Sequence, residues 1–398
     1  MTVVVTSAGL VSSLGDTPAS FHQALCEGRS GQGPVDHFDC DRLPRADAFP
    51  IADFSPREHL GPGNLRALDR TSRLATCGVQ KALDAGTWGD NGAREGLGLV
   101  LGTMFGSIRT ISEFDRRCLE AGPQYVKPLD FANSVINAAA GQAAIWHRLP
   151  GINATLTGGP MAGLQAIGYG ADRIRRGRSR SLLAGGAEEL SFEASFGFTR
   201  AGQVADDGAP RPFSDTGEGF LLGEGAAFLV LEEGAAAGRR GAAPLAEVRG
   251  QGNAFDASRG EHAERAVATA TRAIGLALEE AGLAAGDIAA VFGGASGWRP
   301  GDQCEADALA RIFGARVPVT AIKALVGECL GASGGLQAVA ALETLRTGQL
   351  PGTPGTTDAM AGLDVPSTAR ALDRPENLLI TAAGFDGNHY ALILGRAT

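Results

Sequence analysis

Cysteine is the residue type best suited to covalent chemistry here, and one of the six cysteines, Cys329, directly follows Glu328. A thiol near a helix N-terminus can become a reactive thiolate, because the helix dipole favours the anion and lowers the thiol pKa. However, consecutive helical residues point to different sides, and a nearby carboxylate raises a thiol pKa. We therefore predict that Cys329 is a small buried packing residue, as unpaired cysteines usually are.

The other candidate nucleophiles and metal ligands show no productive spacing. No pair of cysteines forms C-x-x-C, and the six histidines form neither H-x-x-x-H nor H-E-x-x-H, so we expect no disulfide framework, no metal and no cofactor. Three hydroxyl residues stand near the glycine-rich turns without an accompanying histidine: Ser134, Thr157 and Ser333. The remaining cysteines are Cys26, Cys40, Cys77, Cys118 and Cys304.

The composition excludes several classes of protein. Net charge is −9 with a pI near 5.3, and no cluster of Lys and Arg contains interleaved aromatic residues, so nucleic acid is not an expected partner. The sequence begins without the basic flank and apolar stretch of a signal peptide, and it has no run of eighteen apolar residues. We expect a cytoplasmic protein that does not contact a membrane.

Apolar strand signals alternate with amphipathic helical signals, which predicts an α/β layered fold. The predicted strands are 3–5, 97–101, 152–156, 181–184, 245–248, 288–292, 317–322, 378–382 and 390–394. The predicted helices are 70–85, 108–121, 161–176, 262–281 and 330–347.

A strand, a glycine-containing turn and a helix occur twice. The segments that start at Asn153 and at Val319 both contain GLQA, at 163–166 and 335–338, and both end in a basic residue followed closely by glycine. Equivalent placement of the same letters in two such units favours duplicated halves over coincidence. The Gly-rich, basic segment 233–244 is predicted to join the halves as a surface connector.

Several blocks in order resemble the β-ketoacyl synthase family. They are VVVTSAGLVSSLG at the N-terminus, LGLVLGTMFGS, the TLTGGPMAG turn, SLLAGGAEEL, RPFSDTGEGFLLGEGAAFLVLE and the closing ITAAGFDGNHYALIL. The resemblance implies a thiolase-like α/β fold of two duplicated βαβαβ-type halves in five layers, α-β-α-β-α. Its domains would be 1–238, with a dimer-interface insertion, and 239–398.

The sequence departs from the family pattern at the catalytic positions. A ketosynthase uses a cysteine thiolate to accept the acyl group and two histidines for decarboxylation and oxyanion stabilisation. By resemblance, Pro160 stands at the cysteine, Gly294 at the first histidine and Glu328 at the second, while Lys323 is retained. Proline has no thiol and no N–H, and it suits a first helical turn. The acids Asp302 and Glu305 are also retained, and we expect a structural role for them.

Such a chain resembles the chain-length factor, or ketosynthase β subunit, of a type II polyketide synthase. That resemblance implies a non-catalytic subunit that forms a heterodimer with an active ketosynthase, shapes the acyl tunnel and meets an acyl carrier protein through its partner. Because TGGPMAG lacks the Gln typical of aromatic-type factors, the sequence favours a polyene or otherwise reduced product over an aromatic one.

The residues expected at the tunnel and interface are Met104, Phe105, Ile108, Ile111, Phe114, Phe131, Asn133, Val135 and Ile136. Ordinary core packing is the alternative for at least half of them, since an apolar stripe at helical spacing is usually core. We expect substitution of Phe105, Phe114 or Phe131 to change product length.

Two other functions stay open from the sequence. One is an enzyme of altered chemistry on the same fold, such as an acyltransferase or hydrolase that uses another residue. The other is an acyl-binding scaffold homodimer that recruits an acyl carrier protein.

Overall fold

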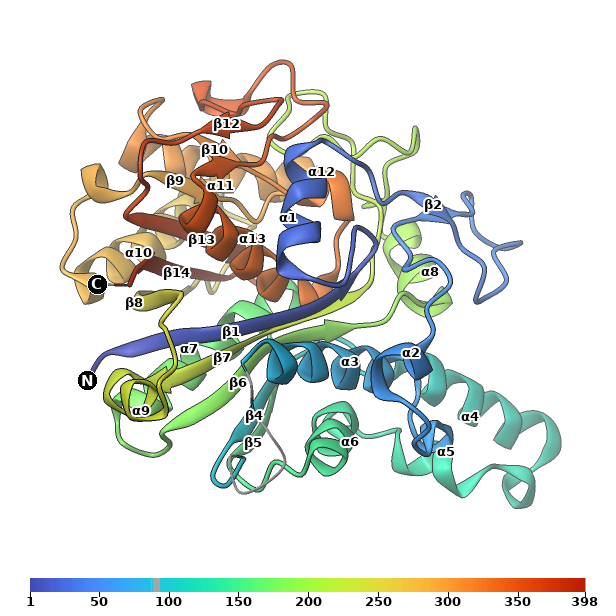
Figure 1. Ribbon diagram of the computed structural model, residues 1–398. Helices are drawn as coiled ribbons and strands as arrows, with labels where there is room; N and C mark the ends of the chain where they lie inside the picture. The colour runs from blue at the N-terminus through green and yellow to red at the C-terminus, as the bar shows by residue number, and fades with distance from the viewer. Residues whose placement is uncertain (87, 89–93, 398) are drawn as a thin grey trace.

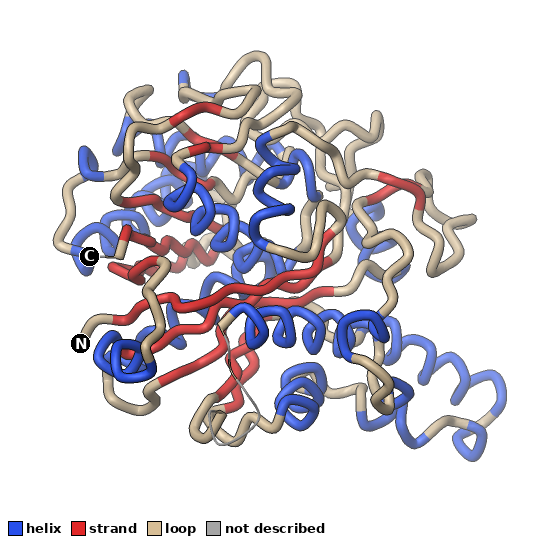
Figure 2. The backbone as a smooth tube through the Cα atoms, viewed as in Figure 1, coloured by secondary structure: helices blue, strands red, loops and turns tan. Residues whose placement is uncertain are grey.

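The computed structural model describes residues 1–398 except 87, 89–93 and 398, and its centre is a ten-stranded sheet (Figures 1 and 2). The first half contributes β1 (Val3–Ser12), β4 (Gly98–Gly102), β5 (Asn153–Leu156), β6 (Ser181–Glu188) and β7 (Gly225–Glu233). The second half contributes β8 (Ala246–Phe255), β9 (Ala290–Phe292), β10 (Val319–Thr320), β13 (Asn377–Ala383) and β14 (Asn388–Arg396). Two small separate sheets pair β2 (Gly33–Pro34) with β3 (Asp47–Ala48) and β11 (Gln349–Leu350) with β12 (Arg370–Ala371).

The two halves repeat one strand order. From the edge inward, the order is β5-β4-β6-β7-β1 in the first half and β10-β9-β13-β14-β8 in the second. In each half the first three strands are parallel, and the fourth is antiparallel to both of its neighbours. The halves join where β1 pairs with β8, at Val4 with Glu247 and Val5 with Ala246. The predicted duplication is confirmed by this shared topology.

The two repeated helices pack against each other in the middle of the molecule. They are α7 (Ala162–Arg175) and α13 (Ser333–Thr347). A Cβ atom on Gly163 would lie 2.5 Å from the backbone oxygen of Gly331, and one on Gly335 would lie 2.6 Å from that of Ala227. The glycine of each GLQA therefore permits a close backbone approach, which explains why both halves carry it.

Helices cover both outer faces of the sheet. The first half is covered by α3 (Arg70–Ala85) and α6 (Ala138–His147), and the second by α10 (Ala263–Ala281) and α11 (Arg299–Phe313). Three large apolar clusters lie between these layers: one around the central helices and one under each outer pair. The arrangement is the predicted α/β layered, thiolase-like fold.

Shorter elements surround this core. The helices are α1 (Pro18–Cys26), α2 (Pro56–Leu60), α4 (Ile108–Ala121), α5 (Pro128–Ala132), α8 (Phe192–Arg200), α9 (Gly234–Arg240) and α12 (Lys323–Val326). Two 3₁₀ turns matter below, η3 (Gly159–Met161) and η5 (Leu330–Ala332). In Figure 1, α4 and α5 extend away from the body of the molecule at the lower right.

The segment 233–244 connects β7 of the first half to β8 of the second at the surface, as predicted. Within it, residues 234–240 form α9, which was not predicted, and Arg240 Nη2 donates to the buried Glu232 at 2.7 Å. The strand β7 was not predicted. It lies between β1 and β6 with eight of its nine residues buried, so its sequence lacks the polar alternation of a half-exposed strand. The domain boundary at residue 238 stays a prediction.

Candidate functional site

The glycine-rich turn that leads into α7 forms an elbow. After β5 the chain passes through η3, where Gly159 has φ +66° and Pro160 is buried, and α7 begins two residues later. The left-handed backbone at Gly159 favours glycine, while Pro160 stands at the start of the helix, where its missing N–H costs nothing.

The structure brings the other aligned positions together beside this elbow. Lys323 Nζ donates to the backbone oxygen of Gly294 at 2.7 Å and to Glu328 Oε2 at 2.6 Å. The turn η5 follows Glu328 and packs against η3, which carries Pro160. The four positions singled out by resemblance therefore converge on one place, although they come from three distant segments.

Glu328 is fully engaged by its neighbours. Its Oε1 accepts hydrogen bonds from the Leu330 N–H at 2.9 Å and from the Ser333 hydroxyl at 2.8 Å. Glu328 is 2% exposed and Lys323 3% exposed. The pair is therefore a buried, hydrogen-bonded ion pair. Of the three hydroxyl residues considered in the sequence, Ser333 contacts a carboxylate, that of Glu328, which Lys323 already neutralises.

The two retained acids, Asp302 and Glu305, bind the backbone of nearby loops through hydrogen bonds. Asp302 accepts backbone N–H groups of Phe213, Ser296 and Gly297 at 2.9–3.0 Å, and burial raises its pKa to about 7. Glu305 accepts the Gly294 N–H at 2.9 Å, and burial raises its pKa. These bonds fix the loop that carries Gly294, which is a positioning arrangement.

Cys329 is a packing residue, as predicted. Its side chain is 1% exposed, and the thiol donates to the backbone oxygen of Val326 at 3.3 Å. Burial, reinforced by the negative charge of Glu328, raises the pKa of this thiol well above its usual range. A thiol held protonated in this way is not a nucleophile.

The expected tunnel and interface residues separate into two groups. Met104 and Phe105 turn toward the body and pack against an aromatic cluster made of Phe198, Phe220, Trp298 and Phe385. The rings of Phe105 and Phe198 lie 6.2 Å apart between centroids. These two residues, called here the inner wall because the sequence predicts that they line a tunnel, lie in the same apolar cluster as Leu330 of η5.

The second group lies on an exposed apolar surface, called here the α4–α6 surface. Its exposed side chains are Leu119, Tyr125, Leu129, Phe131, Val135, Ile136 and Ile145. Phe131 is 65% exposed and its ring lies 5.9 Å from that of Phe114. Along α4, which carries Ile108 and Ile111, no residue is buried.

Core packing does not account for the predicted set. Of its nine residues only Asn133 is buried, and its amide donates to the backbone oxygen of Ala67 at 2.9 Å. Asn133 also accepts from Gln142, so it fixes the loop between α5 and α6. An apolar stripe on a projecting helix has the same periodicity as one facing the core, and the sequence could not separate the two.

The sequence analysis missed Glu188, a carboxylate at the end of β6 that lies beneath Met104 and Phe105. The only signal was its position at the end of the SLLAGGAEEL block.

Within the residues that the structure describes, no group of three or more His, Cys, Asp or Glu side chains could hold a metal ion. No helix in the same part of the chain is long and apolar enough to cross a membrane.

Comparison with known proteins gives two family matches. Residues 1–237 match the β-ketoacyl synthase N-terminal domain, and residues 245–357 match the β-ketoacyl synthase C-terminal domain. Among curated relatives, 3-oxoacyl-[acyl-carrier-protein] synthase 2 of Vibrio harveyi is 30% identical over 407 residues, covering 98% of this chain and 97% of that protein.

Polyketide proteins are similar to the same degree. Actinorhodin polyketide β-ketoacyl synthase 2 of Streptomyces coelicolor is 31% identical over 406 residues, covering 100% of this chain and 99% of that protein. Among solved structures, the ishigamide ketosynthase/chain length factor superposes with a TM-score of 0.92 at 29% identity, covering 100% of this chain and 99% of that one. With both domain models matched and full-length relatives at this identity, the chain belongs to the β-ketoacyl synthase family.

Proposed function

We propose that this chain is a non-catalytic chain-length factor, which pairs with an active ketosynthase and shapes the tunnel that holds a growing polyketide or polyene chain. The observation that carries the proposal is the Lys323–Glu328 ion pair. It stands where the family pattern has a catalytic histidine, beside an elbow that offers Pro160 in place of a thiol. The thiol beside this cluster, that of Cys329, is buried and its raised pKa keeps it protonated, so under this proposal it accepts no acyl group.

The α4–α6 surface supports the choice of a ketosynthase as partner. The exposed apolar side chains within residues 119–145 favour association, and obligate interfaces are apolar. This face adjoins β5, the edge strand of the first half, so a partner could reach both. Under this proposal Met104 and Phe105 line the tunnel, and α4, which begins at Ile108, carries residues of the interface.

An altered enzyme would need a free base beside an accessible nucleophile. Ser333 is 3% exposed, and Glu328, the carboxylate it contacts, is bound to Lys323. This geometry gives the hydroxyl no free base, and therefore favours the non-catalytic role.

A second role, contact with an acyl carrier protein, is favoured by a depression of about 590 Å³ whose lining includes Arg57, Arg66 and Arg73. None of the three arginines forms an ion pair with another described residue. Unpaired arginines in an otherwise acidic protein suit an acidic partner. This role is compatible with the heterodimer and also with a scaffold homodimer.

Coexpression with a ketosynthase that retains Cys and both His residues tests the proposal. We expect the two chains to elute together from a size-exclusion column. Val135→Asp, on the α4–α6 surface, should abolish coelution because it places a charge in an apolar interface. Leu245→Asp is the matched control, since Leu245 is 44% exposed, comparable to Val135 at 53%, but lies elsewhere.

Coelution that survives Val135→Asp, or that Leu245→Asp also abolishes, would contradict this interface. Elution of the wild-type chain only as a homodimer would favour the scaffold instead.

A further inference from the structure

Glu188 is a buried carboxylate that binds the turn carrying the inner wall. It is 1% exposed. Its oxygens accept the Met104 N–H at 2.5 Å, the Phe105 N–H at 2.9 Å and the Thr103 hydroxyl at 3.1 Å. Three consecutive residues at the end of β4 therefore point their donors at one side chain.

The same carboxylate also binds η5. Its Oε2 accepts the N–H of Gly331 at 3.1 Å, and Gly331 lies in η5, three residues after Glu328. Glu188 forms no ion pair with any described Lys or Arg, in contrast to Glu224, which is bound by Arg70 at 2.6 Å. Burial raises the pKa of Glu188 to about 7, and four hydrogen-bond donors, with no cation, oppose that rise and hold the side chain in place.

The neighbouring residues fix the same stretch of chain. Glu189 accepts the Arg109 N–H in the first turn of α4 at 3.3 Å, and the Thr71 hydroxyl donates to the Gly106 oxygen at 2.9 Å. Residues 103–109 are thus attached at several points between the sheet and α4. Within this stretch, Glu188 binds residues 103–105 and so fixes the backbone from which the Phe105 ring projects.

We propose that Glu188 is a positioning residue for chain length: by fixing the backbone of Met104 and Phe105 against η5, it sets how far this wall projects into the acyl tunnel. The proposal rests on the proposed function, because it needs a tunnel whose length is read out as product. It assigns to Glu188 no contact with the acyl chain.

The chemistry of the site dictates the test substitution. Glu188→Gln keeps the shape, but its NH₂ group would face at least one of the backbone N–H donors, and a donor facing a donor leaves a buried group unpaired. The turn must then shift, so Phe105 is held less firmly. We expect products of neighbouring lengths to appear at the expense of the main product.

Asp256→Asn is the matched control. Asp256 is also a carboxylate, 3% exposed, and it accepts two backbone N–H groups and one hydroxyl with no ion pair among the described residues. Its donors belong to Ser258 and Gly260, neither of which is an expected tunnel residue. A general loosening of the fold would follow from either variant, whereas only Glu188 binds the turn at Met104 and Phe105.

The experiment measures product lengths by liquid chromatography and mass spectrometry for the intact heterodimer. Thr103→Val, which removes one of the four donors, gives a milder second variant, and it should shift the distribution in the same direction. An unchanged distribution in both Glu188→Gln and Thr103→Val, with coelution preserved, would overturn the proposal. An equal shift with Asp256→Asn would also overturn it.

A second set of variants separates the positioning role of Glu188 from the proposed chain-length role on which it rests. They are Phe105→Ala, Phe114→Ala and Phe131→Ala. If these three leave product length unchanged, the chain-length role itself fails. If any of them changes length while Glu188→Gln does not, only the positioning role fails.

Discussion

At the residue scale, the main feature of the site is a buried ion pair. Lys323 is the cation that Glu328 neutralises, and both side chains are almost fully buried. Removing one partner of a buried pair leaves an uncompensated charge, which costs more than the pair itself contributes. A carboxylate at 328 is therefore suited to a chain that keeps the lysine.

Glu328→Ala should lower the free energy of unfolding by about 3–5 kcal/mol, because it leaves Lys323 buried without its partner. Urea denaturation monitored by circular dichroism measures this loss. Glu343→Ala is the control: its partner Arg346 has a side chain that is 59% exposed, so breaking that pair should cost less than about 1 kcal/mol. Similar losses of unfolding free energy for the two variants would show that Glu328 is not needed to neutralise the buried charge of Lys323.

The sequence predicted which positions form this site but not the interactions between them. Pro160, Gly294, Lys323 and Glu328 could be aligned because glycine-rich turns and a repeated helix mark their surroundings. The bond from Lys323 to the Gly294 backbone oxygen could not be foreseen, because it depends on how two loops far apart in sequence approach each other. Glu188 was missed for the same reason, since all its partners are non-local.

At the scale of elements, long periodic helices were predicted accurately and short ones were not. The predicted helices 70–85 and 108–121 coincide with α3 and α4. The short helices α1, α8 and α9 were not predicted. Helices of this length are marginally stable by themselves and depend on tertiary contacts, which the local sequence does not reveal. The sequence also could not tell that α4 leaves the body of the molecule, because the apolar stripe gives no information about what covers it.

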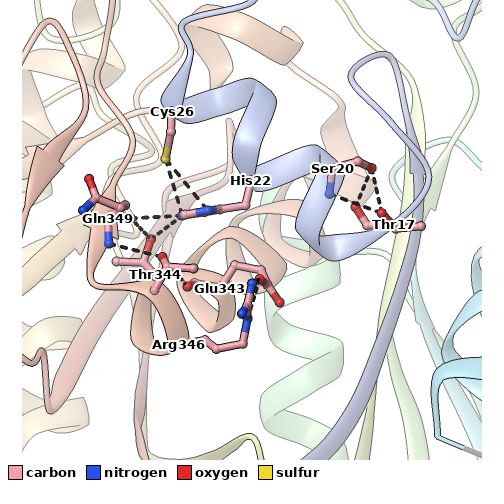
Figure 3. Close-up of polar contacts among 9 residues, drawn as sticks. Thr17, Ser20, His22, Cys26, Glu343, Thr344, Arg346 and Gln349 are labelled. Carbon is pink, nitrogen blue, oxygen red and sulfur yellow. Dashed lines mark hydrogen bonds and ion pairs between the residues drawn. The ribbon is translucent and has the colours of Figure 1, made fainter.

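The contact between α1 and α13 should make stability depend on pH. Figure 3 shows His22 of α1 beside Thr344 and Gln349, with its Nε2 3.0 Å from the Gln349 oxygen and Cys26 on its other side. Burial lowers the pKa of His22 below its usual 6.5, and the charged groups that act on it are Glu343 and Arg346. The folded protein therefore keeps this imidazole neutral.

Below about pH 6.5 the unfolded chain takes up a proton at His22 that the folded chain does not, so this residue lowers stability as pH falls. We expect the wild-type urea midpoint to fall more steeply between pH 7 and pH 5 than that of His22→Gln, whose amide can still donate to the Gln349 oxygen. Parallel pH profiles for the two proteins would contradict this assignment.

At the scale of the whole molecule, duplication explains both the fold and the place where the four aligned positions meet. The two halves repeat one strand order, and their central helices bring the elbow turn η3 and the turn η5 together from opposite halves. The positions predicted to correspond to the family's catalytic residues come from both halves, Pro160 from the first and Gly294 and Glu328 from the second. The glycines of the two central helices let the halves approach closely at this junction.

The location of the acyl group in the assembled heterodimer tests the central claim most directly. The measurement is intact-protein mass spectrometry of both chains after incubation with an acyl-loaded carrier protein. The account predicts an acyl adduct on the ketosynthase partner, lost when the partner's active-site cysteine is replaced, and no adduct on this chain. An acyl adduct on this chain would show that it has a nucleophile, and it would contradict the non-catalytic role.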